Sequence, residues 1–233
     1  MYNTRAVWLA AAVLISVLSG CLSDDTESGA SDPGASESED PLAKEQEAMG
    51  EALLTPYQSP SGQFEVSFPA TWTAEETFDG GAVMLANKRE AIERYQAGTA
   101  PEEADLVVNV GFLPATLFEQ RELKRFEVTD DLAPDDYLRA VLPIFETVDA
   151  ATLGEVELVT LSDGTDAGAV SIEASDREGR ILTLAAGPRV RAIISMTTAP
   201  GQGHLYEEVV EAIAATSTFN GDGEALYGRL LTG

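Results

Sequence analysis

Alternating hydrophobic positions predict a β-strand about a quarter of the way along the chain. Phe64, Val66 and Phe68 recur at every second position, with a Glu and a Ser between them. Because successive side chains of a strand point to opposite faces, this spacing is typical of a strand with one buried face. Pro69 ends the strand, and Trp72, in the turn that follows, is expected to fill part of the core.

Further apolar segments predict six more strands, at residues 83–86, 106–113, 156–161, 167–174, 180–186 and 189–198. Turn-forming sequences separate the last four: Ser162-Asp163-Gly164, then Asp176-Arg177-Glu178-Gly179, then Gly187-Pro188. Parallel neighbours need long crossovers, so connections this short predict an antiparallel meander over residues 167–198.

Helical patterns lie between and after these strands. Asn87-Lys88-Arg89-Glu90 resembles a capping box that opens a helix to about residue 97, with Gly98 at its end. Pro134, followed by two Asp residues, predicts the start of a second helix, which Pro143 should kink or shorten. Periodic apolar positions predict a short leading helix at 45–54 and a final helix at 203–216, with Phe219 closing the core.

The order of these elements predicts an α+β fold. A mainly antiparallel central sheet would have the last helix on one face and the earlier helices on the other, forming an α/β/α sandwich. The chain after residue 44 is long enough for one domain with a proper core. Residues 114–133 are expected to be irregular or partly helical.

The first 20 residues resemble a lipoprotein signal peptide. Arg5 precedes an apolar run over 6–18, which at about 13 residues is shorter than the ~20 needed to span a bilayer. Leu18-Ser19-Gly20-Cys21 follows and resembles a lipobox, the motif at which a bacterial-type lipoprotein is cleaved before a diacylated cysteine. Cys21 is the single cysteine of the chain and lies at the position that the motif requires, so it is predicted to carry the lipid. Two acyl chains anchor a protein stably without a transmembrane helix. An ordinary signal peptide is the alternative.

Four regions follow from these patterns. Residues 1–20 are the predicted signal peptide, and 21–44 are the lipidated cysteine with an acidic tether too polar to fold. Residues 45–220 are the predicted single domain, and 221–233 are a loose tail. The tether is expected to lift the domain off the lipid, on the outer or periplasmic side of the cell membrane.

Charge narrows the possible partners. The chain has 40 acidic and 14 basic residues, a formal charge of −26. Nucleic acids and anionic lipid head groups require basic patches, so neither is expected as a partner. An acidic surface is typical of proteins in high salt or of an acidic exported proteome, and it also attracts cations or a basic partner.

The strand predicted from Phe64, Val66 and Phe68, together with the end of the chain, resembles a known family. The sequence Gly62-x-Phe64-x-Val66-x-Phe68-Pro69-x-x-Trp72 is similar to the opening strand of PsbP-like domains and of DcrB-type bacterial lipoproteins. The ending is also similar: an apolar strand over 190–196, Ala199-Pro200, a helix, then Thr216-Ser217-x-Phe219. Over about residues 57–220, the resemblance implies an antiparallel sheet between helices and a role in protein binding or assembly rather than catalysis. The scarcity of lysine departs from the basic docking surfaces of the plant photosystem members, so that role is not carried over.

Residues with possible chemistry are few. His204 is the single histidine and is expected to be a surface or capping residue. No Gly-x-Ser-x-Gly or phosphate-binding Gly-rich motif occurs in the sequence, and no cofactor is expected. Weak candidates for a hard-cation site are the oxygen-bearing side chains of Asn220, Asp222, Glu224, Asp130 and Asp131, which lack the full EF-hand spacing.

Three hypotheses for function follow. The first is a membrane-anchored, non-catalytic module that binds or assembles with an envelope or membrane protein. The second is a module that binds a small ligand or calcium, and the third is a hydrolase that uses clustered carboxylates. Tyr57 and Phe118, whose places in the core are not evident from periodicity, are candidates to border a partner surface.

Overall fold

The computed structural model describes residues 54–60, 62–77, 81–119, 124–129, 131–145, 152–223 and 225. The predicted signal peptide, Cys21, the tether and the helix expected at 45–54 lie outside these residues, apart from Leu54. Within the described residues, no helix combines the length and the apolar character that crossing a membrane requires.

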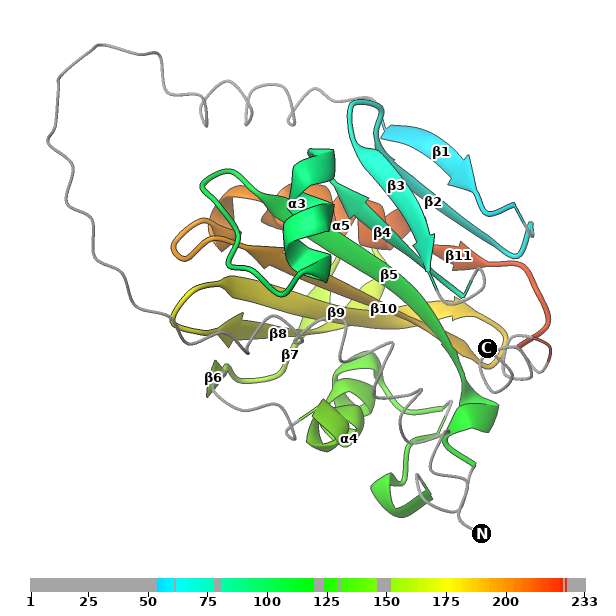
Figure 1. The fold of residues 1–233 in the computed structure, drawn as a ribbon. Helices are drawn as coiled ribbons and strands as arrows, with labels where there is room; N and C mark the ends of the chain where they lie inside the picture. The colour runs from blue at the N-terminus through cyan, green and yellow to red at the C-terminus, as the bar shows by residue number, and fades with distance from the viewer. Residues whose placement is uncertain are drawn as a thin grey trace, which may run out of the picture.

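Two antiparallel sheets make up most of the domain (Figure 1). The small sheet has the order β1-β2-β11, with β1 at Leu54–Gln58, β2 at Phe64–Pro69 and β11 at Thr218–Phe219. The large sheet has the order β3-β4-β5-β10-β9-β8-β6, and β7 also pairs with β8. Its strands are β3 (Thr73–Thr77), β4 (Ala82–Ala86), β5 (Leu106–Pro114), β6 (Thr152–Leu153), β7 (Glu157–Thr160), β8 (Asp166–Glu173), β9 (Glu178–Gly187) and β10 (Val190–Thr198).

The meander predicted over residues 167–198 is confirmed. Strand β9 pairs with both β8 and β10 in antiparallel register. Every residue of β10 is buried, because the strand lies in the middle of the sheet and is covered on both faces. Arg189, in the turn before β10, has a positive φ of 57°, which the tight two-residue connection requires.

Helices cover both faces of the large sheet, which confirms the predicted α+β class. Cross-strand partners place Ala82, Gly111, Ile193, Thr183 and Gly168 in one row across one face. Helix α4 (Pro134–Phe145) packs at the Gly168 end of this face, where the Thr183 hydroxyl donates to the Pro134 carbonyl at 3.0 Å. Helix α3 (Arg89–Gln96) packs on the same face at the other end of the sheet, through a cluster that includes Ile92, Met84 and Val107. Helix α5 (Glu207–Thr216) lies on the opposite face.

The strand predicted from Phe64, Val66 and Phe68 exists, but it belongs to the small sheet. All three side chains are buried, and the Phe64 ring lies 5.0 Å from the ring of Phe112 in β5. Phe219 of β11 packs on the same Phe112 ring at 5.6 Å. The small sheet therefore extends the layer of α5 and closes the core, as was expected for Phe219.

The predicted capping box at residues 87–90 is wrong, although the helix it was meant to open is present. Lys88 is the N-cap residue and makes no side-chain cap hydrogen bond. The Asn87 side chain instead donates to the Ala104 carbonyl at 2.6 Å and accepts from the Leu106 N–H at 3.1 Å. It thereby fastens the start of α3 to the start of β5. At the other end of the helix, Gly98 has the positive φ, 72°, expected of a residue that ends a helix.

Two short 3₁₀ turns, η2 (Ala115–Leu117) and η3 (Lys124–Phe126), lie in the region expected to be partly helical. Phe118, a candidate for a partner surface, is buried and packs edge-on against Tyr137 at 5.9 Å. That interpretation of Phe118 is therefore wrong. Trp72 is buried, as predicted.

Candidate functional site

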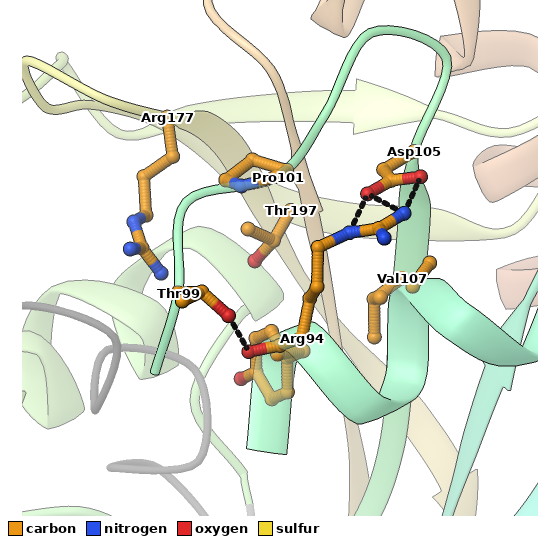
Figure 2. Close-up of a pocket in the computed structure, with 9 residues that line it drawn as sticks. Arg94, Thr99, Pro101, Asp105, Val107, Arg177 and Thr197 are labelled. Atoms are coloured by element: carbon orange, nitrogen blue, oxygen red, sulfur yellow. Dashed lines mark hydrogen bonds and ion pairs between the residues drawn. The ribbon is translucent and has the colours of Figure 1, made fainter. Parts of the chain in front are cut away.

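A small pocket lies between α3, the loop that follows it, β10 and the turn between β8 and β9 (Figure 2). Its enclosed space is about 10 Å³, roughly that of one water molecule. Arg94 reaches it from α3, Asp105 from the start of β5, and Arg177 from the turn before β9. Thr197 of β10 lines its base.

Asp105 is the centre of an ion-pair cluster at this pocket. Its side chain is 1% exposed, and its two oxygens accept hydrogen bonds from Arg94 Nε and Nη2 at 2.7 and 2.8 Å. Lys88 Nζ lies 2.7 Å from the same carboxylate, and the Glu102 N–H donates to it at 2.9 Å. Burial by itself would raise the pKa of Asp105, but the hydrogen bonds from Lys88, the Glu102 N–H and Arg94 outweigh it and hold the pKa below its ordinary value.

Arg177 is also buried and paired. Its guanidinium donates to both oxygens of the neighbouring Asp176, at 3.1 and 2.8 Å. This hydrogen bonding lowers the pKa of Asp176 below its ordinary value, despite some desolvation. Burial raises the pKa of Tyr95, whose hydroxyl oxygen accepts from Asn109 Nδ2 at 3.3 Å. The pocket is thus built from charges that already neutralise one another, and its evident role is to tie α3 to β5 and to the end of β10.

A different cluster, on the α5 face of the sheet, has a surplus of negative charge. Arg180 of β9 is 12% exposed and lies near three carboxylates. Glu211 of α5 is at 3.2 Å, Glu207 of α5 at 3.5 Å and Glu157 of β7 at 3.6 Å. One positive charge faces three negative ones, so two charges of the cluster remain uncompensated by Arg180.

Secondary structure explains how these four residues meet. Glu207 and Glu211 are four positions apart on α5, so they share one face of the helix. Glu157 is the cross-strand partner of Ala169, which in turn pairs with Leu182, two residues from Arg180 on the same face of β9. The side chains of Glu157 and Glu207 are 63% and 51% exposed, so their carboxylates stand at the solvent boundary. We call Arg180, Glu157, Glu207 and Glu211 the Arg180 cluster.

The Arg180 cluster borders the edge of the large sheet. Strand β7 pairs with β8 on one side and with no other strand of the described chain. Leu158, the residue after Glu157, is 52% exposed, and it is the one large hydrophobic side chain exposed among the residues that the structure describes. An acidic group and an apolar group are therefore exposed at consecutive positions of this edge, on opposite faces of the sheet.

Of the residues singled out from the sequence as a cation site, the structure describes Asp131, Asn220 and Asp222. Asp131 is exposed, and a hydrogen bond with the Thr129 hydroxyl lowers its pKa below the ordinary value. Asn220 and Asp222 are exposed near the end of the domain, where the Asn220 N–H donates to the Gln63 carbonyl at 2.7 Å. Asp130 and the Glu224 side chain lie outside the described residues, as does Cys21. Over the described ranges, no group of three or more His, Cys, Asp and Glu side chains is placed to hold a metal ion.

The Arg180 cluster was not predicted from the sequence, although one part of it was visible there. The spacing of Glu207 and Glu211 is typical of acids that share a helix face, whereas the approach of Glu157 depends on strand pairing. His204, expected at the surface, is exposed in the 3₁₀ turn η4 (Gly203–Leu205) that precedes α5.

Comparison with known proteins gives a likeness of fold. No protein-family model and no curated protein sequence matches the chain. Among solved structures, the chain is similar to the Ran-binding protein Mog1p of Saccharomyces cerevisiae, with 12% identity and a TM-score of 0.46 over 76% of this chain and 99% of that one. It is similar to cyanobacterial PsbP from Synechocystis, with 16% identity and a TM-score of 0.43 over 72% and 93% of the two chains.

A third similar structure is LpqN of Mycobacterium tuberculosis, a protein involved in cell envelope biogenesis. Its identity to this chain is 10% and the TM-score is 0.42, over 73% of this chain and 92% of LpqN. The three structures share a PsbP-like fold with one another.

Proposed function

We propose that this protein is an exported lipoprotein, anchored through Cys21, whose folded domain binds another protein at the membrane surface. The Arg180 cluster is the observation that carries the binding part of the proposal. Its glutamates are partly exposed and outnumber the one arginine they share, and the exposed Leu158 lies at the same sheet edge on the opposite face. Protein interfaces combine polar and apolar contacts of this kind.

The anchoring part of the proposal is supported by the sequence. Cys21 directly follows an apolar run and three residues that resemble a lipobox, and residues 22–43 contain seven acids and no basic residue. Removal of residues 1–20 removes Arg5 and no acid, which leaves 13 basic and 40 acidic residues and a formal charge of −27. A mature chain of that charge favours a basic partner and is repelled by anionic lipid heads, so the lipid rather than the protein surface would hold it at the membrane.

Two carboxylates that are held in ion pairs favour binding over catalysis in this proposal. The carboxylates with lowered pKa values are held by direct partners, as Asp105 is by Arg94 and Asp135 by Arg139. A group with a lowered pKa is a poor general acid or base near neutral pH, because its proton is already lost and its affinity for a new one is weak.

A crosslinking experiment in intact cells tests this proposal. The wild-type chain is compared with the Cys21→Ser variant after membrane fractionation and affinity capture. We expect the wild type to sediment with membranes and to capture one envelope protein, while Cys21→Ser appears in the soluble fraction and captures much less of it. Equal membrane association of the two proteins would contradict the anchor, and absence of any captured protein with the wild type would contradict the binding role.

A further inference from the structure

We propose that the β7 edge of the large sheet binds an extended segment of a partner protein in which basic and apolar side chains alternate. The inference rests on the proposed binding function and assigns it a surface and a class of ligand. The surface consists of β7 and the Arg180 cluster.

The backbone of β7 supplies the first part of the argument. An edge strand presents main-chain N–H and C=O groups on its unpaired side, and an extended peptide can bond to them as an additional strand. Strand β7 pairs with β8 on one side, and its other side has no strand partner among the residues that the structure describes. Three of its four residues, Glu157, Leu158 and Thr160, are exposed.

The two faces of β7 supply the pattern expected of the ligand. Glu157 shares a face with Ala169 and with the Arg180 cluster, whereas Leu158 is the partner of Gly168 and lies on the α4 face. Side chains of an added strand would alternate between the same two faces. A residue that lies beside Glu157 meets excess negative charge, and its neighbour in sequence meets the exposed Leu158.

Charge complementarity then selects the residue types. A lysine or arginine beside Glu157 would also lie near Glu207, and it would add the positive charge that Arg180 alone does not provide. Pairs of opposite charge across neighbouring strands are favourable, as are apolar pairs. On the α4 face the exposed side chain of β7 is Leu158, and the nearby Arg139 is already bonded to Asp135, Asp136 and the Val156 carbonyl. An apolar side chain is therefore the better match on that face.

The competing interpretation is that β7 is merely a protected edge. Short strands with charged side chains are a common means of preventing unwanted strand pairing. Protection predicts that β7 binds no peptide of any charge, whereas the proposal predicts affinity for a basic, alternating one. The two interpretations are therefore separable by experiment.

The probe is a short capped peptide in which lysine alternates with valine, and the protein is the full chain in micelles of a neutral detergent. Binding is followed by calorimetry and by amide hydrogen exchange at low salt. We expect saturable binding and slower exchange of β7 amides. We also expect binding to weaken several-fold when the salt is raised to about 0.5 M, because partly exposed charges are screened. A peptide of the same sequence with N-methyl groups at every residue has the same charge but no backbone N–H with which to pair as a strand, and it should bind at least about tenfold more weakly.

Two variants of equal net charge distinguish binding at this site from attraction by the overall negative charge of the protein. Replacement of Glu157, Glu207 and Glu211 by Gln should reduce affinity at least about tenfold. Replacement of three exposed acids in and after α3, Glu90, Glu93 and Glu103, changes the net charge equally and should leave affinity within about twofold. Equal losses with the two variants, equal binding of the N-methylated peptide, or no binding by the wild type would overturn the proposal.

The same variants distinguish this inference from the proposed function. If the anchored wild type captures an envelope protein and the Glu157, Glu207 and Glu211 triple variant captures it equally well, the β7 surface is not the binding site. The anchored binding function would stand in that case, and the assignment of its surface would be rejected.

Discussion

The carboxylate of Asp105 and the guanidinium of Arg94 form two parallel hydrogen bonds, of 2.7 and 2.8 Å, at a position where the carboxylate is almost completely buried. This pair joins α3 to the start of β5, and Asn87 makes a second link between the same two elements. The helix is only eight residues long, so its place on the sheet depends on such links as well as on the packing of Ala91 and Ile92.

Loss of Arg94 is therefore expected to be costly. Arg94→Ala leaves Asp105 buried with Lys88 as its remaining cationic partner, and we expect a loss of about 2–3 kcal/mol in the free energy of unfolding. The control is Arg89→Ala on the same helix, which removes a pair with Glu93 whose side chains are 68% and 65% exposed and should cost no more than about 0.5 kcal/mol. Urea unfolding of both variants measures the difference, and equal losses would show that the buried pair contributes nothing special.

The same pair predicts a dependence of stability on pH. The pKa of Asp105 is lower in the folded protein than in the unfolded chain, so its contribution is present above about pH 4 and is lost as the pH falls through the folded value. In Arg94→Ala, burial is opposed by fewer hydrogen bonds, so the pKa of folded Asp105 rises and less stability is lost on acidification. Unfolding free energies measured from about pH 3 to 7 for the wild type and the variant should diverge least at the acidic end.

Tyr57 predicts a second dependence of stability on pH, at alkaline pH. Desolvation, followed by the hydrogen bond that its hydroxyl donates to Glu76 at 2.8 Å, raises the pKa of Tyr57 to about 12. The stability that this interaction contributes is present below about pH 10 and is lost as the pH rises toward 12. Spectrophotometric titration of wild type and Tyr57→Phe should show one high-pKa phenol missing from the variant. In Glu76→Gln the Tyr57 transition should move down toward 10, and an unchanged titration would exclude the contact.

The backbone of α4 packs directly against Gly168 of β8. A Cβ at this position would collide with the Pro134 carbonyl and lie 2.8 Å from the Asp135 Cα, both of them backbone atoms of α4. We expect Gly168→Ala to cost about 2 kcal/mol or more, since the helix must shift away from the sheet. In Gly154→Ala the new methyl meets only the hydroxyl end of Ser171, which can rotate, so the loss should stay below about 1 kcal/mol. Thermal unfolding of the two variants makes the comparison, and similar melting temperatures would contradict it.

Glu178 is expected to stabilise the loop that leads from β10 to α5. Its carboxylate accepts from the Gly201 N–H at 2.7 Å and also from the Gly203 N–H, so it holds the loop between β10 and the helix. Glu178→Ala should cost about 1–2 kcal/mol and speed amide exchange in the 201–206 loop. Glu173→Ala, at the exposed cross-strand partner of Glu178, should change neither by much. Unaltered exchange in Glu178→Ala would show that the loop is held by other contacts.

Periodicity predicted much of the fold because the buried positions of most strands show as a local pattern of apolar residues. The meander of β8, β9 and β10 and the helix beginning at Pro134 were all found near their predicted positions. The strands β1 and β3 were not predicted. Pro56 interrupts the pattern of β1, and every residue of β3, Thr-Ala-Glu-Glu-Thr, is partly buried. An edge strand of this kind has no strong alternation to reveal it.

The candidate site was less accessible to sequence reasoning, for a physical reason. Arg180, Glu157 and Glu211 are brought together by two strand pairings and by the packing of α5, none of which is encoded in local spacing. Asn87 illustrates the same limit, because its residue type suits a helix cap but its side chain bonds to a loop and a strand farther along the chain.

Strand β2 meets β11 through the pairing of Phe64 with Phe219, which lie near opposite ends of the domain. The N–H of Ser67 likewise bonds to the Thr216 side chain at 2.9 Å. Contacts between residues so distant in sequence form late, because a long loop must close first. A chain that emerges from a ribosome with its N-terminus first would thus be unable to complete the small sheet until residues 218–219 had emerged. Until then β2 lacks its partner β11, so this part of the core stays open while the rest of the domain can already fold.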